Sequence, residues 1–180
     1  MCSGCSRWKT FRPTARPAPP ASMTDFTLYG GSNNEIEMAE EFREAHEKAR
    51  EHDLPVVMWS YPRGQGLKND TKPSTISYAS RLAHELGADV AKVKYPGSKE
   101  AMEHAVQMAG KTKVVMSGGS KTSDRDFLES VKAVIDAGGA GLAVGRNVFQ
   151  RENPRRILDA LEKVIYEEST VDAALAAAEE

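Results

Sequence analysis

The sequence predicts an α/β fold built on a parallel β-sheet. Five short apolar segments, each suited to a strand, are followed in turn by segments with helical periodicity, and this strict alternation is typical of strands joined by crossover helices. The units recur at intervals of roughly 25–30 residues, as in a (β/α)₈ barrel, but a complete barrel needs about 200 residues or more. Either an open doubly wound sheet or a barrel without its first three units fits this length.

The first two units contain the clearest strand signals. A strand is expected over residues 26–29, and the helix after it has an apolar stripe among acidic and basic residues. The second strand, residues 55–61, is apolar and stops at Pro62. Its helix is expected over residues 73–86, before a glycine that ends it.

The third and fourth units follow the same pattern. A strand within residues 88–97 carries two lysines, and a helix over residues 99–109 comes after it. The next strand, residues 113–117, runs into two glycines. Either Ser123 or Asp124 is expected to cap the helix that follows, because both side chains can accept a hydrogen bond from a free backbone N–H.

The fifth unit ends the predicted domain. A strand over residues 141–144 leads to a glycine, residues 147–150 could form a short extra helix, and proline opens a last helix over residues 154–166. The barrel-like domain therefore spans residues 25–169. The acidic, alanine-rich tail of residues 170–180 is expected either to fray or to continue as a helix.

Composition excludes several classes of protein. The chain has 180 residues, of which 40% are hydrophobic and 28% charged, a balance typical of globular proteins. It contains no apolar run of membrane-spanning length, and its net charge of -2 gives no reason to expect nucleic-acid binding. The only cysteines are Cys2 and Cys5, too few for a zinc site or a disulfide scaffold. We therefore expect a cytoplasmic protein with no metal and no cofactor.

Residues 1–24 differ from the rest of the chain. Residues 1–22 are proline-rich and basic, contain no acidic residue and have no apolar periodicity, so they cannot bury enough surface to fold. Their prolines oppose the amphipathic helix of an organelle transit peptide. We interpret residues 1–24 as a disordered leader that is not native to the protein, with Met23 as an alternative start.

Two lysines point to covalent chemistry. Lys92 and Lys94 lie two residues apart on a strand and therefore share one face with Val90. A lysine directed into a packed interior loses solvation, so its pKa falls and its amine can attack a carbonyl to form a Schiff base. The alternative is an edge strand with two solvated lysines. Alternation alone does not distinguish Lys92 from Lys94.

Aromatic residues end the preceding strand. Trp59 and Tyr61 share the face opposite Ser60. If they face inward, they provide an aromatic wall and a phenol that can move protons. The alternative is that both rings only contribute to packing.

Glycine-rich loops follow the last two strands. Ser117, Gly118 and Gly119 end one strand, and Gly145 and Arg146 end the next. Glycines let backbone N–H groups approach an anion, and the loops after strands seven and eight of (β/α)₈ barrels frequently bind phosphate. These loops therefore predict a phosphate site.

Other charged residues are expected to be structural or solvated. Lys121 and Arg63 are interpreted as surface charges, although either could touch a second phosphate. The four histidines all fall on predicted helices, away from the carboxyl ends of the strands where chemistry is placed in this fold class, so we expect them to be structural.

Four motifs together resemble a known family. Residues 59–64, 88–97, 115–119 and 143–148 look like the archaeal-type class I fructose-bisphosphate aldolases, which are Schiff-base enzymes with (β/α)₈ barrels. The likeness runs over residues 26–168 with the motifs in order. It implies strands four to eight of the barrel, with the first three units missing.

The resemblance also implies roles for individual residues. Lys92 matches the Schiff-base lysine, Tyr61 the proton donor and Trp59 a substrate-lining position. Positions that bind the substrate phosphate match Ser117, Gly118, Gly119, Gly145 and Arg146. The implied reaction is reversible cleavage of fructose 1,6-bisphosphate to glycerone phosphate and glyceraldehyde 3-phosphate, without a metal. The implied partners are a phosphorylated sugar and, for a complete family member, further copies of the same chain.

The same sequence leaves two other functions open. The chain could belong to a related aldolase that acts on another phosphorylated sugar or makes an aromatic-amino-acid precursor. It could instead be a non-catalytic half-barrel that binds phosphorylated ligands or assembles with another chain. The family's missing units include a catalytic aspartate at the end of strand one, so we expect the chain as written to be truncated and poorly active.

Overall fold

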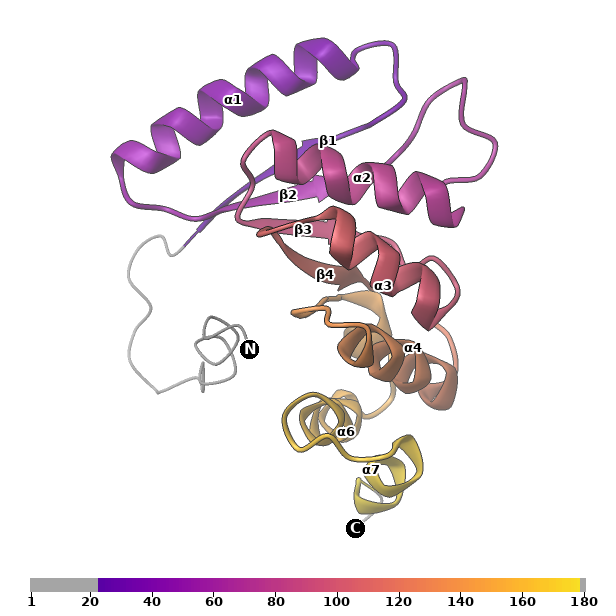
Figure 1. Ribbon diagram of the computed structural model, residues 1–180. Coiled ribbons are helices and arrows are strands. Elements are labelled where there is room, and N and C mark those ends of the chain that lie inside the picture. Colours follow the sequence, from indigo (N-terminus) through magenta and orange to yellow (C-terminus); the bar gives the residue numbers. More distant parts are fainter. Residues whose placement is uncertain (1–22, 179–180) are drawn as a thin grey trace.

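Five parallel strands form one sheet in residues 23–178, the part of the chain that the computed structural model describes (Figure 1). The strands are β1 (Thr24–Leu28), β2 (Val56–Ser60), β3 (Val90–Val93), β4 (Lys113–Ser117) and β5 (Gly141–Ala143). Each strand pairs with the next one in the chain, so their order in the sheet is β1-β2-β3-β4-β5. A doubly wound sheet reverses its order at a switch point. The strictly sequential order instead confirms the architecture of a partial (β/α)₈ barrel.

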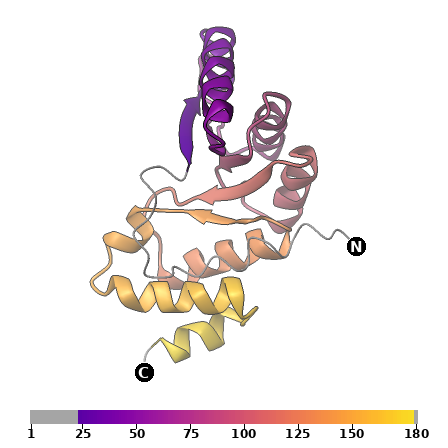
Figure 2. The same cartoon turned by 90° about the vertical axis from the view of Figure 1, so that its left-hand side faces the viewer.

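Helices follow the strands on the outside of the sheet. They are α1 (Glu35–Glu51), α2 (Pro73–Glu85), α3 (Lys99–Met108), α4 (Asp124–Asp136), α5 (Arg146–Phe149), α6 (Pro154–Tyr166) and α7 (Val171–Ala177). The strands change direction progressively from β1 to β5, and the helices keep to one side of this curve (Figure 2). Parallel strands twist in one hand and need crossover connections, which accounts for this arrangement.

The core lies between the sheet and these helices. Alternate strand residues that face the helices are buried: Leu28, Val56, Met58, Ala91, Val93, Val114 and Met116. The residues between them are only partly buried, because the opposite face of the sheet carries no helical layer in the described chain. This second face, called the inner face below, therefore holds side chains that are accessible to a ligand.

The predicted boundaries agree closely with the observed ones. Strand β4 and helix α6 begin and end at the expected residues. Strand β1 starts at Thr24, which pairs with Val56, and ends at Leu28, so it begins two residues before the expected strand of residues 26–29 and ends one residue before it. Ser123 rather than Asp124 caps α4, since its hydroxyl accepts a 3.1 Å hydrogen bond from the Asp126 N–H.

The tail forms a helix instead of fraying. The Thr170 hydroxyl caps α7 by accepting a 3.3 Å hydrogen bond from the Ala173 N–H. Ala174 is fully buried among α4, α6 and α7, and Arg125 of α4 forms a 2.7 Å ion pair with Asp172. Alanine-rich segments have high helix propensity, but packing is what stabilises so short a helix.

The expectations for residues 1–22, including Cys2 and Cys5, lie outside the described residues. Within residues 23–178, no helix is both long enough and apolar enough to cross a membrane. The same residues contain no group of three or more His, Cys, Asp or Glu side chains placed to hold a metal ion.

Candidate active site

The central strand places Lys92 in the middle of the inner face. The sheet register aligns Thr27, Trp59, Lys92 and Val115 on four adjacent strands. Ala91 and Val93 flank Lys92 in the chain and point into the core. Because successive side chains on a strand alternate, Lys92 must point to the inner face.

Trp59 forms one wall of the lysine site. The Lys92 Nζ atom lies 3.7 Å from the centroid of the indole ring. Partial burial lowers the pKa of Lys92 from its ordinary value, while the charge of Asp25 acts in the opposite direction. The ring face also favours the ammonium form. The net result of these effects is a lowered pKa of Lys92, which increases the fraction of neutral amine, the form that attacks a carbonyl.

Lys94 differs from Lys92 in its surroundings. It lies one residue beyond β3 and forms an ion pair with Asp70, which comes from the loop between β2 and α2. An amine that is engaged by a carboxylate in an ion pair is not free to attack a carbonyl. The structure therefore separates two lysines that strand alternation leaves equivalent.

Tyr61 continues the aromatic wall beyond the end of β2. Its ring centroid lies 6.1 Å from that of Trp59, and its backbone N–H donates a 3.0 Å hydrogen bond to the Leu28 carbonyl. Burial raises the pKa of Tyr61, while a hydrogen bond with the Ser117 side chain and the charge of Arg63 partly offset this rise. The phenol is thus protonated at neutral pH and can donate a proton.

Ser60 explains why these rings face inward. Its side chain is buried and donates a 2.9 Å hydrogen bond to the Ala79 carbonyl of α2. Since Ser60 is fixed on the helical side, its neighbours Trp59 and Tyr61 must lie on the opposite face.

The two predicted glycine loops lie side by side. Gly118 follows β4, and a Cβ atom added to it would come within 2.8 Å of the Val144 side chain, so the loops after β4 and β5 touch at this point. Gly119 has a φ of 59°, which favours glycine. Gly145 and Arg146 form the start of α5. The structure therefore brings the predicted phosphate-binding residues to one corner of the strand ends.

This close approach gives a stability prediction. Gly118→Ala is expected to lower the free energy of unfolding by about 1–3 kcal/mol, because the added methyl group overpacks against Val144. Gly66→Ala is the matched control, since a Cβ atom there meets nothing within 4 Å. Urea unfolding followed by circular dichroism measures both variants. Equal stability of the two would contradict the predicted close contact.

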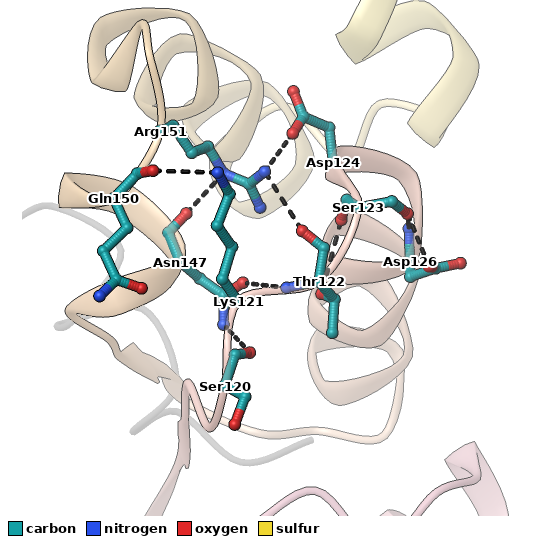
Figure 3. A network of polar contacts seen from close by, with 9 residues as sticks. All are labelled: Ser120, Lys121, Thr122, Ser123, Asp124, Asp126, Asn147, Gln150 and Arg151. Atoms are coloured by element: carbon teal, nitrogen blue, oxygen red, sulfur yellow. Dashed lines mark hydrogen bonds and ion pairs between the residues drawn. The ribbon is translucent and has the colours of Figure 1, made fainter.

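A polar network joins the same two loops, and sequence reasoning missed it (Figure 3). Asn147 of α5 is 1% exposed, and its side chain hydrogen-bonds to the backbone of residues 118–122. Arg151 and Lys121 add further contacts between the loops. A single asparagine after Gly-Arg carries no sequence signal for such a role.

Asp25 and Asp70 were also missed. Asp25 shares the inner face with Lys92 by alternation, a signal that was present in the sequence. Asp70 lies in a polar loop and contacts Lys94 across 24 residues of chain, a pairing for which the sequence contains no signal.

The remaining charged residues lie outside the lysine site. Arg63 lies 5.6 Å above the Tyr29 ring, and the Lys121 ammonium donates a 2.9 Å hydrogen bond to the Gln150 carbonyl. Of the histidines, His46 stacks on Phe42 within the helical layer. The others are His52, His84 and His104, and they lie in or at the end of α1, α2 and α3.

The fold agrees with comparisons to known proteins. The model of the DeoC/LacD family aldolases matches residues 20–151. A class 1 fructose-bisphosphate aldolase of Halobacterium salinarum is 75% identical over 155 residues, which cover 86% of this chain and 59% of that protein. The 2-amino-3,7-dideoxy-D-threo-hept-6-ulosonate synthase of the same species is 33% identical over 158 residues, covering 88% of this chain and 59% of the synthase.

A solved structure gives the same result. An archaeal fructose-1,6-bisphosphate aldolase, whose catalytic lysine is covalently bound to the carbinolamine intermediate of the substrate, superposes with a TM-score of 0.79 at 45% identity. The superposition covers 81% of this chain and 59% of the aldolase. The chain thus spans about three fifths of the length of these relatives. Because the family model matches well over half of its residues, the chain belongs to the DeoC/LacD family of aldolases.

Proposed function

We propose that the protein provides the Schiff-base site of a class I aldolase that cleaves fructose 1,6-bisphosphate reversibly. The observation that carries this proposal is the position of Lys92, which is partly desolvated on the inner face against Trp59 and has a lowered pKa. The similarity of the chain to class 1 fructose-bisphosphate aldolases supports the choice of substrate.

The chemistry follows from these side chains. The neutral amine of Lys92 attacks the C2 carbonyl, and loss of water gives an iminium ion. The electron pair of the C3–C4 bond moves into the iminium, the C4 hydroxyl loses its proton, and glyceraldehyde 3-phosphate leaves as an aldehyde. Protonation of the resulting enamine at C3 and hydrolysis release glycerone phosphate and free Lys92. In this scheme Tyr61 is the proton donor to C3 of the enamine.

The glycine loops hold a phosphate group of the sugar in this proposal. Ser117, Gly118, Gly119, Gly145 and Arg146 are its ligands. The Ser117 side chain also contacts Tyr61, so phosphate binding and proton transfer share a residue. Within residues 23–178, no backbone carbonyl accepts a hydrogen bond from the N–H groups of Gly119, Gly145 and Arg146, so these groups are available to an anion.

Trapping with borohydride tests the lysine assignment. In a chimera that places the amino-terminal part of the Halobacterium salinarum relative before residue 23, glycerone phosphate and borohydride are expected to label Lys92. Peptide mass spectrometry locates the label. Lys94→Arg, which keeps a cation beside Asp70, is expected to retain it, and Lys92→Arg to lose it. A label on Lys94, or none in the chimera, would refute the assignment.

A second substrate class has specific support. The 33% identity to the hept-6-ulosonate synthase supports a related reaction at the same lysine as the second candidate. Comparing cleavage of several phosphorylated ketoses by the chimera distinguishes the two candidate functions. We expect fructose 1,6-bisphosphate to give the highest kcat/KM. Cytoplasmic location and assembly into homo-oligomers stay predictions.

A further inference from the structure

We infer that Asn147 is a positioning residue that aims the backbone N–H of Gly119 at the substrate phosphate. The inference rests on the proposed function, since it concerns the phosphate-binding loops of that site. It assigns a role to a buried side chain that is not itself among the proposed ligands.

Asn147 uses its whole amide group on one loop. Its Nδ2 atom donates to the Gly118 carbonyl and, at 2.9 Å, to the Ser120 carbonyl, while its Oδ1 atom accepts a 3.0 Å hydrogen bond from the Thr122 N–H. The side chain is 1% exposed, so water does not compete for these bonds. A single amide thus fixes three points on the backbone between β4 and α4, and Figure 3 draws two of these contacts, those with Ser120 and Thr122.

The geometry of the peptide bond transmits this constraint to Gly119. The bond between Gly118 and Gly119 is trans, so the Gly118 carbonyl and the Gly119 N–H point in opposite directions in one plane. Because Asn147 holds the carbonyl, the N–H points away from Asn147. No backbone carbonyl in the described chain accepts a hydrogen bond from this N–H. Gly119 has a φ of 59°, and glycine has wide rotational freedom about its backbone bonds. The peptide plane between Gly118 and Gly119 therefore needs a restraint from outside the loop, which Asn147 provides.

Arg151 holds Asn147 in turn. Its Nε atom donates a 2.6 Å hydrogen bond to the Asn147 carbonyl, and its Nη1 atom donates to the Thr122 carbonyl at 3.4 Å and pairs with Asp124. The Arg151 side chain is 6% exposed and lies 5.6 Å above the Phe127 ring. This second set of contacts links α5, which begins with Arg146, to the same loop (Figure 3).

The resulting network preorganises the site. Hydrogen-bond donors that are already aimed at an anion need no rearrangement when it binds, which increases affinity. If the plane between Gly118 and Gly119 rotates freely, one donor to the phosphate is lost for most of the time. The network therefore acts on ligand binding through the backbone, beyond its effect on stability.

The test measures binding of inorganic phosphate to the 180-residue chain by ¹H–¹⁵N NMR titration. In the wild type, the Gly119 amide resonance is expected to shift on binding. Asn147→Ala is expected to weaken binding roughly tenfold or more, because hydrogen bonds to charged groups are among the stronger ones. Asn147→Ser keeps one hydroxyl donor and is expected to recover part of this loss.

Ser123→Ala is the matched control. It removes the side chain that caps α4, which lowers the stability of the chain, but it leaves the Gly118 carbonyl bonded to Asn147. Its phosphate affinity is expected to stay within about twofold of the wild type. If the Asn147 variants do not fold, Arg151→Lys replaces them. Lysine can keep the pair with Asp124 but cannot also hold the two carbonyls, so binding is expected to weaken severalfold.

The outcomes separate the two proposals. Equal phosphate binding by wild type, Asn147→Ala and Arg151→Lys, or an equal loss in Ser123→Ala, would overturn the role of Asn147. A wild type that binds no phosphate would overturn both this role and the proposed phosphate site. Phosphate binding that depends on Asn147, together with no borohydride label on Lys92, would overturn only the proposed lysine chemistry.

Discussion

The polypeptide of these 180 residues is expected to cleave fructose 1,6-bisphosphate roughly 10⁴-fold or more slowly than the chimera that adds the amino-terminal part of the Halobacterium salinarum relative. A missing acid–base group typically costs a factor of about 10²–10⁴, and loose positioning adds roughly another 10². The family resemblance implies that such a group, an aspartate, comes from strand one. A coupled assay for the aldehyde product measures the cleavage rate of both proteins.

The open sheet is the structural reason for the expected loss of activity. Strands β1 and β5 each pair on one side only in the described chain, so the inner face that holds Lys92 stays open. A cavity of about 560 Å³ beside β5, lined in part by Leu142 and Ile165, adds to this open edge. Unpaired strand edges also favour aggregation, so the oligomeric state must be measured alongside activity.

Phosphate binding is the control for this prediction. The loops that contain Gly118 and Arg146 lie wholly within the described residues, so inorganic phosphate is expected to bind both the 180-residue chain and the chimera. Turnover by the chain close to that of the chimera would show that the five-stranded sheet is sufficient for catalysis.

Tyr61→Phe in the chimera is expected to lower kcat by about 10²–10⁴, the range for loss of a general acid or base. The variant keeps the ring against Trp59, so we expect no more than a small change in stability. Borohydride labelling of Lys92 should persist, because attack on the carbonyl does not need the phenol. The measurement is the ratio of turnover to labelling.

Tyr95→Phe is the matched control for Tyr61→Phe. Burial also raises the pKa of Tyr95, but this residue packs against the core and lies near Glu100 of α3. Its replacement is expected to leave kcat unchanged within about twofold. A similar loss in both variants, or none in Tyr61→Phe, would remove Tyr61 from the proposed mechanism.

The role of Lys94 shows the limit of strand patterns. Alternation places Lys92 and Lys94 on the same face, and the resemblance to the family selects Lys92. The physical difference between them comes from Asp70, which reaches Lys94 from a loop, and from Trp59, which is aligned with Lys92 by the sheet register. Neither contact follows from the order of residues within β3.

The sequence by itself determined the α/β class with five strand–helix units, the single strand face that Trp59 and Tyr61 share, and the position of the glycine loops after the last two strands. These features depend on periodicity and on the common direction of parallel strands, both of which are local properties of the chain. Only the tertiary structure decided that Lys94 is paired, that α7 packs as a helix, and that Asn147 joins two loops. Each of these depends on which distant segments come into contact, and such contacts arise from packing after the strands have taken their register.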